Sequence, residues 1–495
     1  MKTYDGYHLI IQTLAYGFIL VVGLSVIAII WMYFYDKHQT RHAVRHNFPV
    51  IGRLRYLFEH WGTFFRQYFF ALDREEMPFN RAQRSWVYKA AKDLDNTSAF
   101  GSTQHAYGAG TVFFANSLYP MLDNTQQEPH AVTVGPNTDH PYHCNSFFHI
   151  SAMSYGAISA PAVKALSRGA KIAGVWMNTG EGGLSPYHLE GGCDIVFQIG
   201  TGKFGVRDEK GELSSNKLKD LGAIPNIKMF EIKLSQGAKP GKGGILPGVK
   251  VSNEIANIRG ISPGQAAISP NRFHEIEGPN DILALIKRVR TATRKPTGIK
   301  LCLGNPFEIE ALCEAILEAG AEHAPDFITI DSGDGGTGAA PMSLIDNVGM
   351  PLSESLPTIV DILVRYNLRE RVKVVASGKL INPSDVAWAL CAGADFVNNA
   401  RGFMFSLGCI QAMQCNNNTC PTGITTHNKR LQAGLDPNDK SLRVAQYAKN
   451  MAKEVGIIAH SCGVNEPRML RRHHLRTIEN ENASQNNSRH STKTK

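Results

Sequence analysis

The chain has 495 residues, of which 43% are hydrophobic, with nine cysteines and a formal net charge of +9. This length exceeds what one compact domain usually needs. The cysteines are mostly scattered singly, which excludes a disulfide scaffold and fits a large, reduced cytoplasmic core. The positive charge gathers behind the first apolar segment and at residues 468–476, a pattern that favours anionic lipid headgroups over nucleic acid as the partner.

The first predicted element is a transmembrane helix over residues 10–34, which follows a short N-terminal segment, 1–9. The run carries no charged residue and is long enough, at about 1.5 Å per residue, to cross a hydrocarbon core of about 30 Å. Basic residues follow the run, which disfavours a cleaved signal peptide. They are Lys37, Arg41, Arg45, Arg53 and Arg55. The positive-inside bias then predicts a single pass through the inner (cytoplasmic) membrane, with the bulk of the chain facing the cytoplasm. A buried core helix is the alternative.

Residues 35–145 are expected to form a basic juxtamembrane segment and an N-terminal cap, in which the pattern FNRAQRSWVYKAAK at 79–92 predicts a helix. Beyond it, short apolar or β-branched runs alternate with helical patterns. The eight expected strands are 148–153, 171–179, 194–200, 227–234, 297–303, 326–332, 372–377 and 394–400. Helices are expected between most of them, for example at 161–171, 306–320, 356–368 and 383–393.

Eight strand-then-helix units predict an α/β fold of the TIM (β/α)8 barrel type over residues 146–455, rather than a doubly wound sheet. No strand–GxGxxG–helix fingerprint stands in a suitable place, which disfavours a Rossmann domain. The tail, 456–495, is expected to be basic at first and then disordered, because its last residues lack large apolar side chains.

Glycine and polar residues gather where the predicted strands end, which is where a TIM barrel carries its chemistry. The loops read SAMSYGAIS, NTGEGG, KLSQGAKPGKGG, DSGDGGTGAAP, VVASGKL and NNARGF. Glycine lets backbone amides approach a ligand closely, and the last two loops occupy the usual phosphate site of this fold. Six such loops around one mouth indicate a phosphorylated flavin, FMN. The candidate FMN-binding residues are Ala152, Met153, Ser154, Asn178, Lys300, Gly335, Gly336, Gly378 and Gly402.

Three cysteines, Cys409, Cys415 and Cys420, stand in the string GCIQAMQCNNNTCPTG. Their spacing fits neither a disulfide set, which needs an even count, nor the close cysteine pairs of zinc knuckles. Thiolates are the usual protein ligands of iron–sulfur clusters, so three of them satisfy a cluster of three irons. The spacing alone leaves open that they are buried core thiols, which is the expectation for the other six. Those are Cys144, Cys193, Cys302, Cys313, Cys391 and Cys462.

In the same order along the chain, these motifs closely resemble the FMN-binding domain of glutamate synthase. The resemblance also includes QGAKPGKGG followed by LPGVKVSNEIANIRG, and the cysteine triplet ending in CPTG. It implies a membrane-anchored member of that family whose barrel holds FMN and a 3Fe-4S cluster. The implied reaction reduces 2-iminoglutarate, made from 2-oxoglutarate and ammonia, to L-glutamate.

The resemblance implies that Cys409, Cys415 and Cys420 each hold one iron. It implies that Gln236, Lys239 and Arg259 bind the dicarboxylate substrate and that Glu181 lies beside flavin and substrate. An arginine fork can hold one carboxylate at two points, while a lysine provides a point charge for the other.

Lys300, within an apolar strand, would place a positive charge near the flavin. The candidate catalytic residues are therefore Glu181, Lys239 and Lys300. Lys242 and Lys250 lie in the same loop region as Lys239 and are expected to be surface charges.

We expect neither the glutaminase domain nor the glycine-repeat β-helix of full-length glutamate synthase, so nitrogen would come from free ammonium or from an ammonia-supplying partner. Electrons would come from a ferredoxin-like donor or another subunit, because no pyridine-nucleotide site is visible. Two alternatives stay open. The same cofactors could act on an N-substituted glutamate or another 2-oxo or 2-hydroxy acid, or the chain could be a non-catalytic membrane-tethered scaffold. A flavin 2-hydroxyacid oxidase is disfavoured, because the late-strand loops show no Arg–His pair.

Overall fold

The computed structural model describes residues 2–104, 108–122, 128–480 and 483–486. The chain divides into two compact units, Met1–Ala82 and Gln83–Lys495. The first unit holds the helices α1 Lys2–His38, α2 Ala43–Asn47 and α3 Gly52–Phe65, and the π-helix η1 Arg66–Phe70.

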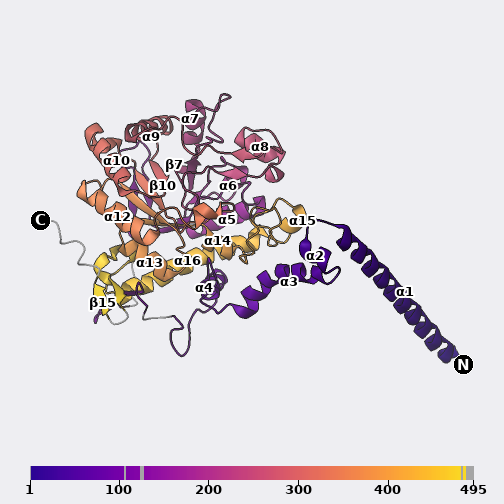
Figure 1. Ribbon diagram of the computed structural model, residues 1–495. Coiled ribbons are helices and arrows are strands. Elements are labelled where there is room, and N and C mark those ends of the chain that lie inside the picture. The colour runs from indigo at the N-terminus through magenta and orange to yellow at the C-terminus, as the bar shows by residue number, and fades with distance from the viewer. Residues whose placement is uncertain (1, 105–107, 123–127, 481–482, 487–495) are drawn as a thin grey trace. The chain divides into compact units, whose positions relative to one another are not determined.

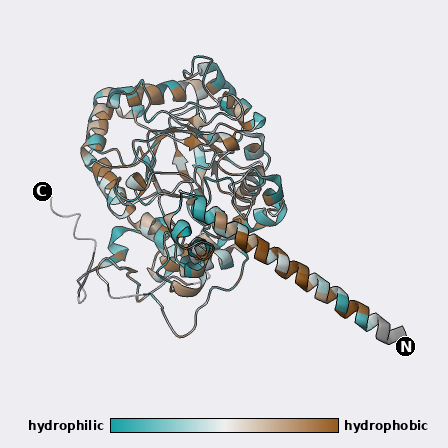
Figure 2. Ribbon diagram, turned by 45° about the vertical axis from the view of Figure 1, so that its right-hand side comes forward, coloured by the Kyte–Doolittle hydropathy of each residue, from teal (hydrophilic) through white to brown (hydrophobic). Residues whose placement is uncertain are grey.

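The apolar run predicted at 10–34 lies within α1, which is coloured largely brown in Figure 2. From Gly6 to His38 this helix is long and apolar enough to cross a membrane, and its most apolar window is fully exposed. This indication comes from length and composition, which a signal sequence near an N-terminus also satisfies. The membrane span therefore stays a prediction.

The second unit is built on a closed barrel of eight parallel strands, so the predicted TIM barrel is confirmed (Figure 1). The strands are β4 Phe148–Ile150, β5 Met177–Asn178, β6 Ile195–Ile199, β7 Ile227–Lys233, β10 Thr297–Leu301, β11 Phe327–Asp331, β12 Lys373–Ser377 and β13 Phe396–Asn399. They pair in chain order, and β13 closes the ring on β4. Each predicted strand contains one of them. The second is the shortest, because residues 171–173 belong to the preceding helix.

Helices follow the strands and surround the barrel (Figure 1). The main ones are α5 Ala160–Ala173, α7 Ser215–Ala223, α9 Pro279–Thr293, α10 Pro306–Ala319, α12 Leu352–Arg365, α13 Pro383–Cys391, α14 Arg401–Ser406 and α16 Pro437–Ser461. Local signals explain their ends. In α5, the Ser159 side chain accepts a hydrogen bond from the N–H of Ala162, and Gly174 ends the helix at a φ of 68°.

Smaller elements complete this unit. They are α4 Arg81–Ala91 at its start, α6 Pro186–Leu189, α8 Asn253–Arg259, α11 Met342–Ile345, α15 Lys429–Gln432, the 3-10 turns η3 Gly248–Lys250, η4 Ala321–His323, η5 Pro467–Met469 and η6 Arg472–His474, and the strands β1 Val112–Phe114, β2 Val132–Val134, β3 Tyr142–Cys144, β8 Ile245–Leu246, β9 Ala267–Ile268, β14 Leu475–Asn480 and β15 Ala483–Asn486. The helix predicted at 79–92 is thus confirmed as α4. Strand β15 lies within the tail for which the sequence predicts disorder, and residues 487–495 lie outside the described residues.

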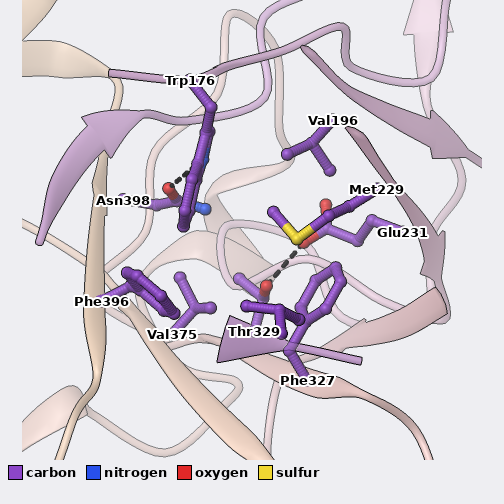
Figure 3. A pocket seen from close by; sticks show the side chains of 10 residues that line it. Trp176, Val196, Met229, Glu231, Phe327, Thr329, Val375, Phe396 and Asn398 are labelled. Carbon is purple, nitrogen blue, oxygen red and sulfur yellow. Dashed lines mark hydrogen bonds between the residues drawn. The ribbon is translucent and has the colours of Figure 1, made fainter. Parts of the chain in front are cut away.

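The barrel interior changes from apolar to polar along the strands. In β7 the inward positions are Met229, Glu231 and then Lys233, and β11 shows the same order. The apolar end packs against the β2–β3 hairpin in one buried cluster. Residues of this cluster line most of the small cavity of Figure 3, whose labelled lining includes Trp176, Met229 and Glu231. The polar ends of the strands therefore face the opposite end of the barrel.

The predicted lipid contact of the basic stretch at 468–476 is wrong for Arg468. This side chain is buried, and its guanidinium donates to the carbonyl oxygens of His130 at 2.8 Å and Ser146 at 2.7 Å. Arg472 forms an ion pair of 2.7 Å with Asp361 of α12. Both arginines fasten the C-terminal segment to the barrel unit.

Candidate active site

The long connection between β7 and β10 brings most of the predicted substrate-binding residues to the polar end of the barrel. It contains Gln236 and Lys239, the β8–β9 hairpin, and α8 with Arg259 in its last turn. Lys239 and Arg259 are each only 4% exposed. Since charged side chains are rarely buried without a purpose, this connection is the first place to look for a ligand site.

Glu181 lies at the centre of this region, in the loop after β5. Its Oε1 accepts a hydrogen bond of 3.0 Å from Nζ of Lys233, the last residue of β7. The same Nζ donates to Oε1 of Gln236 at 2.9 Å, and Ser269 Oγ donates to the other Glu181 oxygen at 3.3 Å. Two other segments of the chain, at Lys233 and at Ser269, therefore hold this carboxylate in place.

Two glycines leave room for the Glu181 carboxylate. A Cβ atom at either Gly200 or Gly244 would overlap it. Burial alone would raise the pKa of Glu181, but the charge and hydrogen bond of Lys233, together with the charges of Arg259 and Lys239, outweigh burial and hold that pKa below its ordinary value. Glu181 is therefore ionised at neutral pH.

Arg259 presents a guanidinium that is only partly satisfied. Its Nη2 donates to Ser154 Oγ and to the carbonyl oxygen of Tyr155, both at 3.3 Å, and its plane packs on the ring of Phe204. Its Nε is buried and has no hydrogen-bond partner among the described residues. Burial lowers the pKa of Arg259 to about 10, so the group stays charged at neutral pH.

Lys239 is buried like Arg259, and the charges of both help to lower the pKa of Glu181. Its Nζ donates to the carbonyl oxygen of Ala339, in the loop after β11, at 3.1 Å. Burial lowers the pKa of Lys239, and the charge of Lys233 lowers it further. Within the described part of the chain, Glu181 pairs with Lys233 and no ion pair includes Lys239 or Arg259. Two buried cations are thus left for an anionic ligand, since a buried unpaired charge is costly.

Lys300 is in the strand position expected for it, buried in β10. Its Nζ lies 3.5 Å from Oδ2 of Asp331 at the end of β11. Burial would lower the pKa of Lys300, but the charges of Asp331 and Glu231 outweigh burial and raise it. Deeper in the barrel, Glu231 accepts hydrogen bonds from Asn178 at 2.8 Å and Thr329 at 2.6 Å, the latter drawn in Figure 3.

The loops after β11 and β12 lie against each other at Ser332 and Gly378. Gly378 has a φ of 152°, and a Cβ there would overlap Ser332 Oγ. That oxygen is buried without a hydrogen-bond partner among the described residues. A Cβ at Gly336 would lie 2.7 Å from Nη1 of Arg401, and Gly335 belongs to the same loop. The unsatisfied Ser332 hydroxyl and the bare backbone beside it fit a polar ligand such as a flavin phosphate or its sugar chain.

The other predicted FMN residues have mixed surroundings. Ala152, Met153 and Ser154 lie in the loop after β4, where the N–H of Met153 donates to the carbonyl oxygen of Asn178 at 3.4 Å. The Asn178 side chain is buried and bonded to Glu231. The N–H of Gly402 already donates to Asn399 Oδ1 at 2.7 Å, and Tyr447 fills the place of its Cβ. A phosphate at Gly402 would have to displace that bond.

The cysteine segment follows α14 and is held from outside by Tyr88, whose hydroxyl donates to the carbonyl oxygen of Cys409 at 2.6 Å. The three thiols lie near one another, since Cys415 and Cys420 each affect the pKa of Cys409. Thr425 Oγ1 is buried beside Cys415 and Cys420, close enough to affect the pKa of both thiols. A hydroxyl in this position can donate to a thiolate or a sulfide, which fits the predicted cluster.

Among the described residues, no group of three or more His, Cys, Asp and Glu side chains is placed to hold a single metal ion. A cluster of three irons spreads its thiolates farther apart than one ion does. The iron–sulfur cluster therefore stays a prediction. The other six cysteines are free thiols, buried except for the half-buried Cys302, as expected for structural residues.

The sequence did not identify three charged residues that the structure brings to this region. Lys233 and Arg401 stand directly at strand ends, a position that could have marked them. Lys250, expected to be a surface charge, is buried: its Nζ donates to the carbonyl oxygens of Cys415 at 2.7 Å and Thr425 at 2.6 Å. Cys415 and Thr425 are more than 160 residues away in the chain, so no local pattern indicates the burial of Lys250. Lys242 is exposed as expected.

The chain is similar in sequence to known proteins. Residues 111–465 match the family described as the conserved region in glutamate synthase. The chain is 40% identical over 494 residues to the glutamate synthase large subunit-like protein YerD of Bacillus subtilis, which covers 92% of this chain and 93% of that protein. It is 35% identical over 330 residues to the archaeal-type glutamate synthase (NADPH) of Dehalococcoides mccartyi, covering 66% of this chain and 63% of that protein.

The chain thus spans less than two thirds of the archaeal-type relative. A solved structure of flavocytochrome b2 with sulfite bound aligns with a TM-score of 0.46 and 15% identity, over 81% of this chain and 83% of that one. The fold, the site and the named relatives define a (β/α)8-barrel enzyme of the oxidoreductase class. With the family match and the 40% identity to YerD, the chain belongs to the glutamate synthase family.

Proposed function

We propose that this protein is an FMN and iron–sulfur oxidoreductase of the glutamate synthase type, which reduces 2-iminoglutarate, formed from 2-oxoglutarate and ammonia, to L-glutamate. A bound FMN would supply the hydride that reduces the C=N bond. Arg259 and Lys239 would bind the two carboxylates, with Gln236 beside them. Glu181, kept ionised by Lys233, would face the positive charge of the protonated imine.

The observation that carries this proposal is a pair of buried cations, Lys239 and Arg259, which form no ion pair among the described residues and lie close enough to the ionised Glu181 to help lower its pKa. A monocarboxylate would satisfy one cation and leave the other buried and unpaired. A dicarboxylate satisfies both, which favours 2-oxoglutarate over a simple 2-hydroxy acid.

The test is L-glutamate formation by the full chain, purified without oxygen, with reduced methyl viologen as the electron donor. We expect turnover only when 2-oxoglutarate and ammonium are both present. No glutamate from a preparation that contains flavin would contradict the proposed reaction. Consumption of a different 2-oxo acid or of an N-substituted glutamate would favour the second candidate, a related substrate at the same cofactors.

Replacing Gly244 by alanine is expected to lower this turnover at least about tenfold while leaving the fold intact. The new methyl group would overlap the Glu181 carboxylate, which must then leave Lys233, and one charge-assisted hydrogen bond of roughly 1.5 kcal/mol is lost. Gly304→Ala is the matched control, because a Cβ at Gly304, in the loop after β10, meets open space. Equal turnover in both variants would show that the reaction does not depend on the position of the Glu181 carboxylate beside Lys233.

The affinity for 2-oxoglutarate is expected to fall with rising pH, starting below the ordinary lysine pKa of 10.5, because the pKa of Lys239 is lowered. Only the protonated ammonium attracts a carboxylate, so binding weakens as that proton is lost. Lys239→Met should bind more weakly at neutral pH and lose this dependence, keeping only the decline near the Arg259 pKa of about 10. The measurement is the dissociation constant between pH 7 and 10 by calorimetry. If the dissociation constant of the wild type does not change between pH 7 and 10, Lys239 does not bind the carboxylate as proposed.

The proposal extends to partners and location. The apolar, exposed α1 supports a single-pass anchor in the inner membrane with the barrel on the cytoplasmic side. Electrons would reach the cluster from a ferredoxin-like or other donor protein, and nitrogen would arrive as free ammonium or from an ammonia-supplying partner. A non-catalytic scaffold is disfavoured, because the candidate cations, glycines and thiols are all present.

A further inference from the structure

A second apolar surface lies in the first unit, on α3 and η1. Large apolar side chains recur there at helical spacing and are all exposed, from 41% for Leu57 to 74% for Phe69. They are Leu54, Leu57, Phe58, Trp61, Phe64, Phe65, Tyr68 and Phe69. At about 100° per residue, the six that belong to α3 fall within an arc of about 120°. We call this set the aromatic face of α3.

The opposite side of the same helix is polar. It carries Arg55, Glu59 and Thr63, and Arg66 begins η1. A soluble protein rarely leaves a continuous apolar surface of this size in water. A strongly amphipathic helix with tryptophan and phenylalanine on one side and arginine on the other is typical of segments that lie in a membrane interface.

The start of α3 is fixed at the C-terminal end of α1. The Asp36 carboxylate, in the last turn of α1, is fully buried and accepts hydrogen bonds from Arg53 Nε at 2.7 Å and Arg53 Nη2 at 2.8 Å. It also accepts one from the N–H of Val50 at 3.1 Å, and Arg45 lies 3.4 Å away. A buried carboxylate with two arginine partners makes a strong contact, here between the end of α1 and the start of α3.

The Asp36 contact lies at the end of the apolar run of α1, where residues of the membrane interface are expected. Trp31 stacks on Tyr35 with ring centroids 5.5 Å apart, and the Arg53 guanidinium lies over the ring of Tyr35. Aromatic and basic side chains of this kind mark the level of the lipid headgroups. If α1 spans the bilayer, α3 therefore starts at headgroup depth.

We propose that α3 and η1 lie in the cytoplasmic interface of the membrane as a second, in-plane anchor. The aromatic face of α3 enters the boundary between headgroups and acyl chains, and Arg55 and Arg66 reach anionic headgroups. The occupant of this face is lipid, because the face continues from the end of a helix fit to span a bilayer and carries the matching positive charge. The inference rests on the proposed membrane attachment through α1.

The test uses the full chain in vesicles of phosphatidylcholine and phosphatidylglycerol, some of whose lipids carry bromine near the headgroup, which quenches nearby tryptophan. We expect Trp61→Phe to remove roughly half of the lipid-quenched emission, leaving the part from Trp31 at the end of α1. Trp388→Phe, in α13 of the barrel unit, is the matched control and should leave the quenched emission unchanged.

Equal quenching in the wild type and Trp61→Phe, in protein that resists carbonate extraction from the vesicles, would overturn the inference and leave the α1 anchor standing. It would mean that protein, from this chain or a second copy, covers the aromatic face of α3. Loss of the protein from the vesicles on carbonate washing would instead contradict the α1 anchor itself.

Discussion

Replacing Arg259 by lysine is expected to weaken 2-oxoglutarate binding by about tenfold to a hundredfold, nearly as much as replacing it by alanine. The guanidinium can bind a carboxylate at two points, in charge-assisted hydrogen bonds worth roughly 1.5–3 kcal/mol, and an ammonium cannot reproduce that geometry. The structure keeps Arg259 ready for this contact: Ser154 and Tyr155 orient it, Phe204 supports its plane, and its Nε has no partner among the described residues.

Arg207→Lys is the matched control for this experiment. Its guanidinium also packs on Phe204, but its Nη2 donates to the carbonyl oxygen of Gly260. The control should change the dissociation constant, measured by calorimetry, less than about twofold, as is usual for a surface substitution. If both Arg259 variants bind like the wild type, the pair of buried cations is not the dicarboxylate site.

Replacing any one of Cys409, Cys415 and Cys420 by serine is expected to remove the signal of a three-iron cluster in electron paramagnetic resonance. Each thiolate would hold one iron, and a serine hydroxyl is a poor ligand for it. Iron and acid-labile sulfide, measured on protein purified without oxygen, should fall together with the signal.

Cys462→Ser is the control, since this buried thiol lies at the end of α16 and outside the triplet. It should keep the full cluster content. Wild-type protein without iron and sulfide, or a double replacement in the triplet that keeps them, would show that the three cysteines are core thiols.

Local patterns in the sequence were sufficient to predict the barrel. Alternating apolar strands and capped helices are short-range signals, and each predicted strand contains an observed one. The boundary of β5 was wrong because Lys171–Ala173 carry an apolar pattern that also suits the last turn of a helix, and α5 takes them. Such ambiguity is resolved by the packing of α5 on α16, which is a long-range contact.

The candidate site could be predicted only in part. Glycine loops and the residues Gln236, Lys239 and Arg259 stand in motifs, so the sequence indicates them. The burial of Lys250 and Arg468 depends instead on carbonyl oxygens from distant segments, which satisfy an ammonium or guanidinium away from water. A lysine or arginine outside a strand end carries no local sign of such partners.

The most direct test of the account is the flavin absorption spectrum of the oxidised full chain during titration with 2-oxoglutarate. We expect that denatured protein releases FMN and that the native spectrum shifts in a saturable way, because the ligand would bind Lys239 and Arg259 beside the flavin. Glutarate, which keeps both carboxylates, should compete for the same site. A flavin spectrum that responds to neither dicarboxylate would contradict the proposed substrate site.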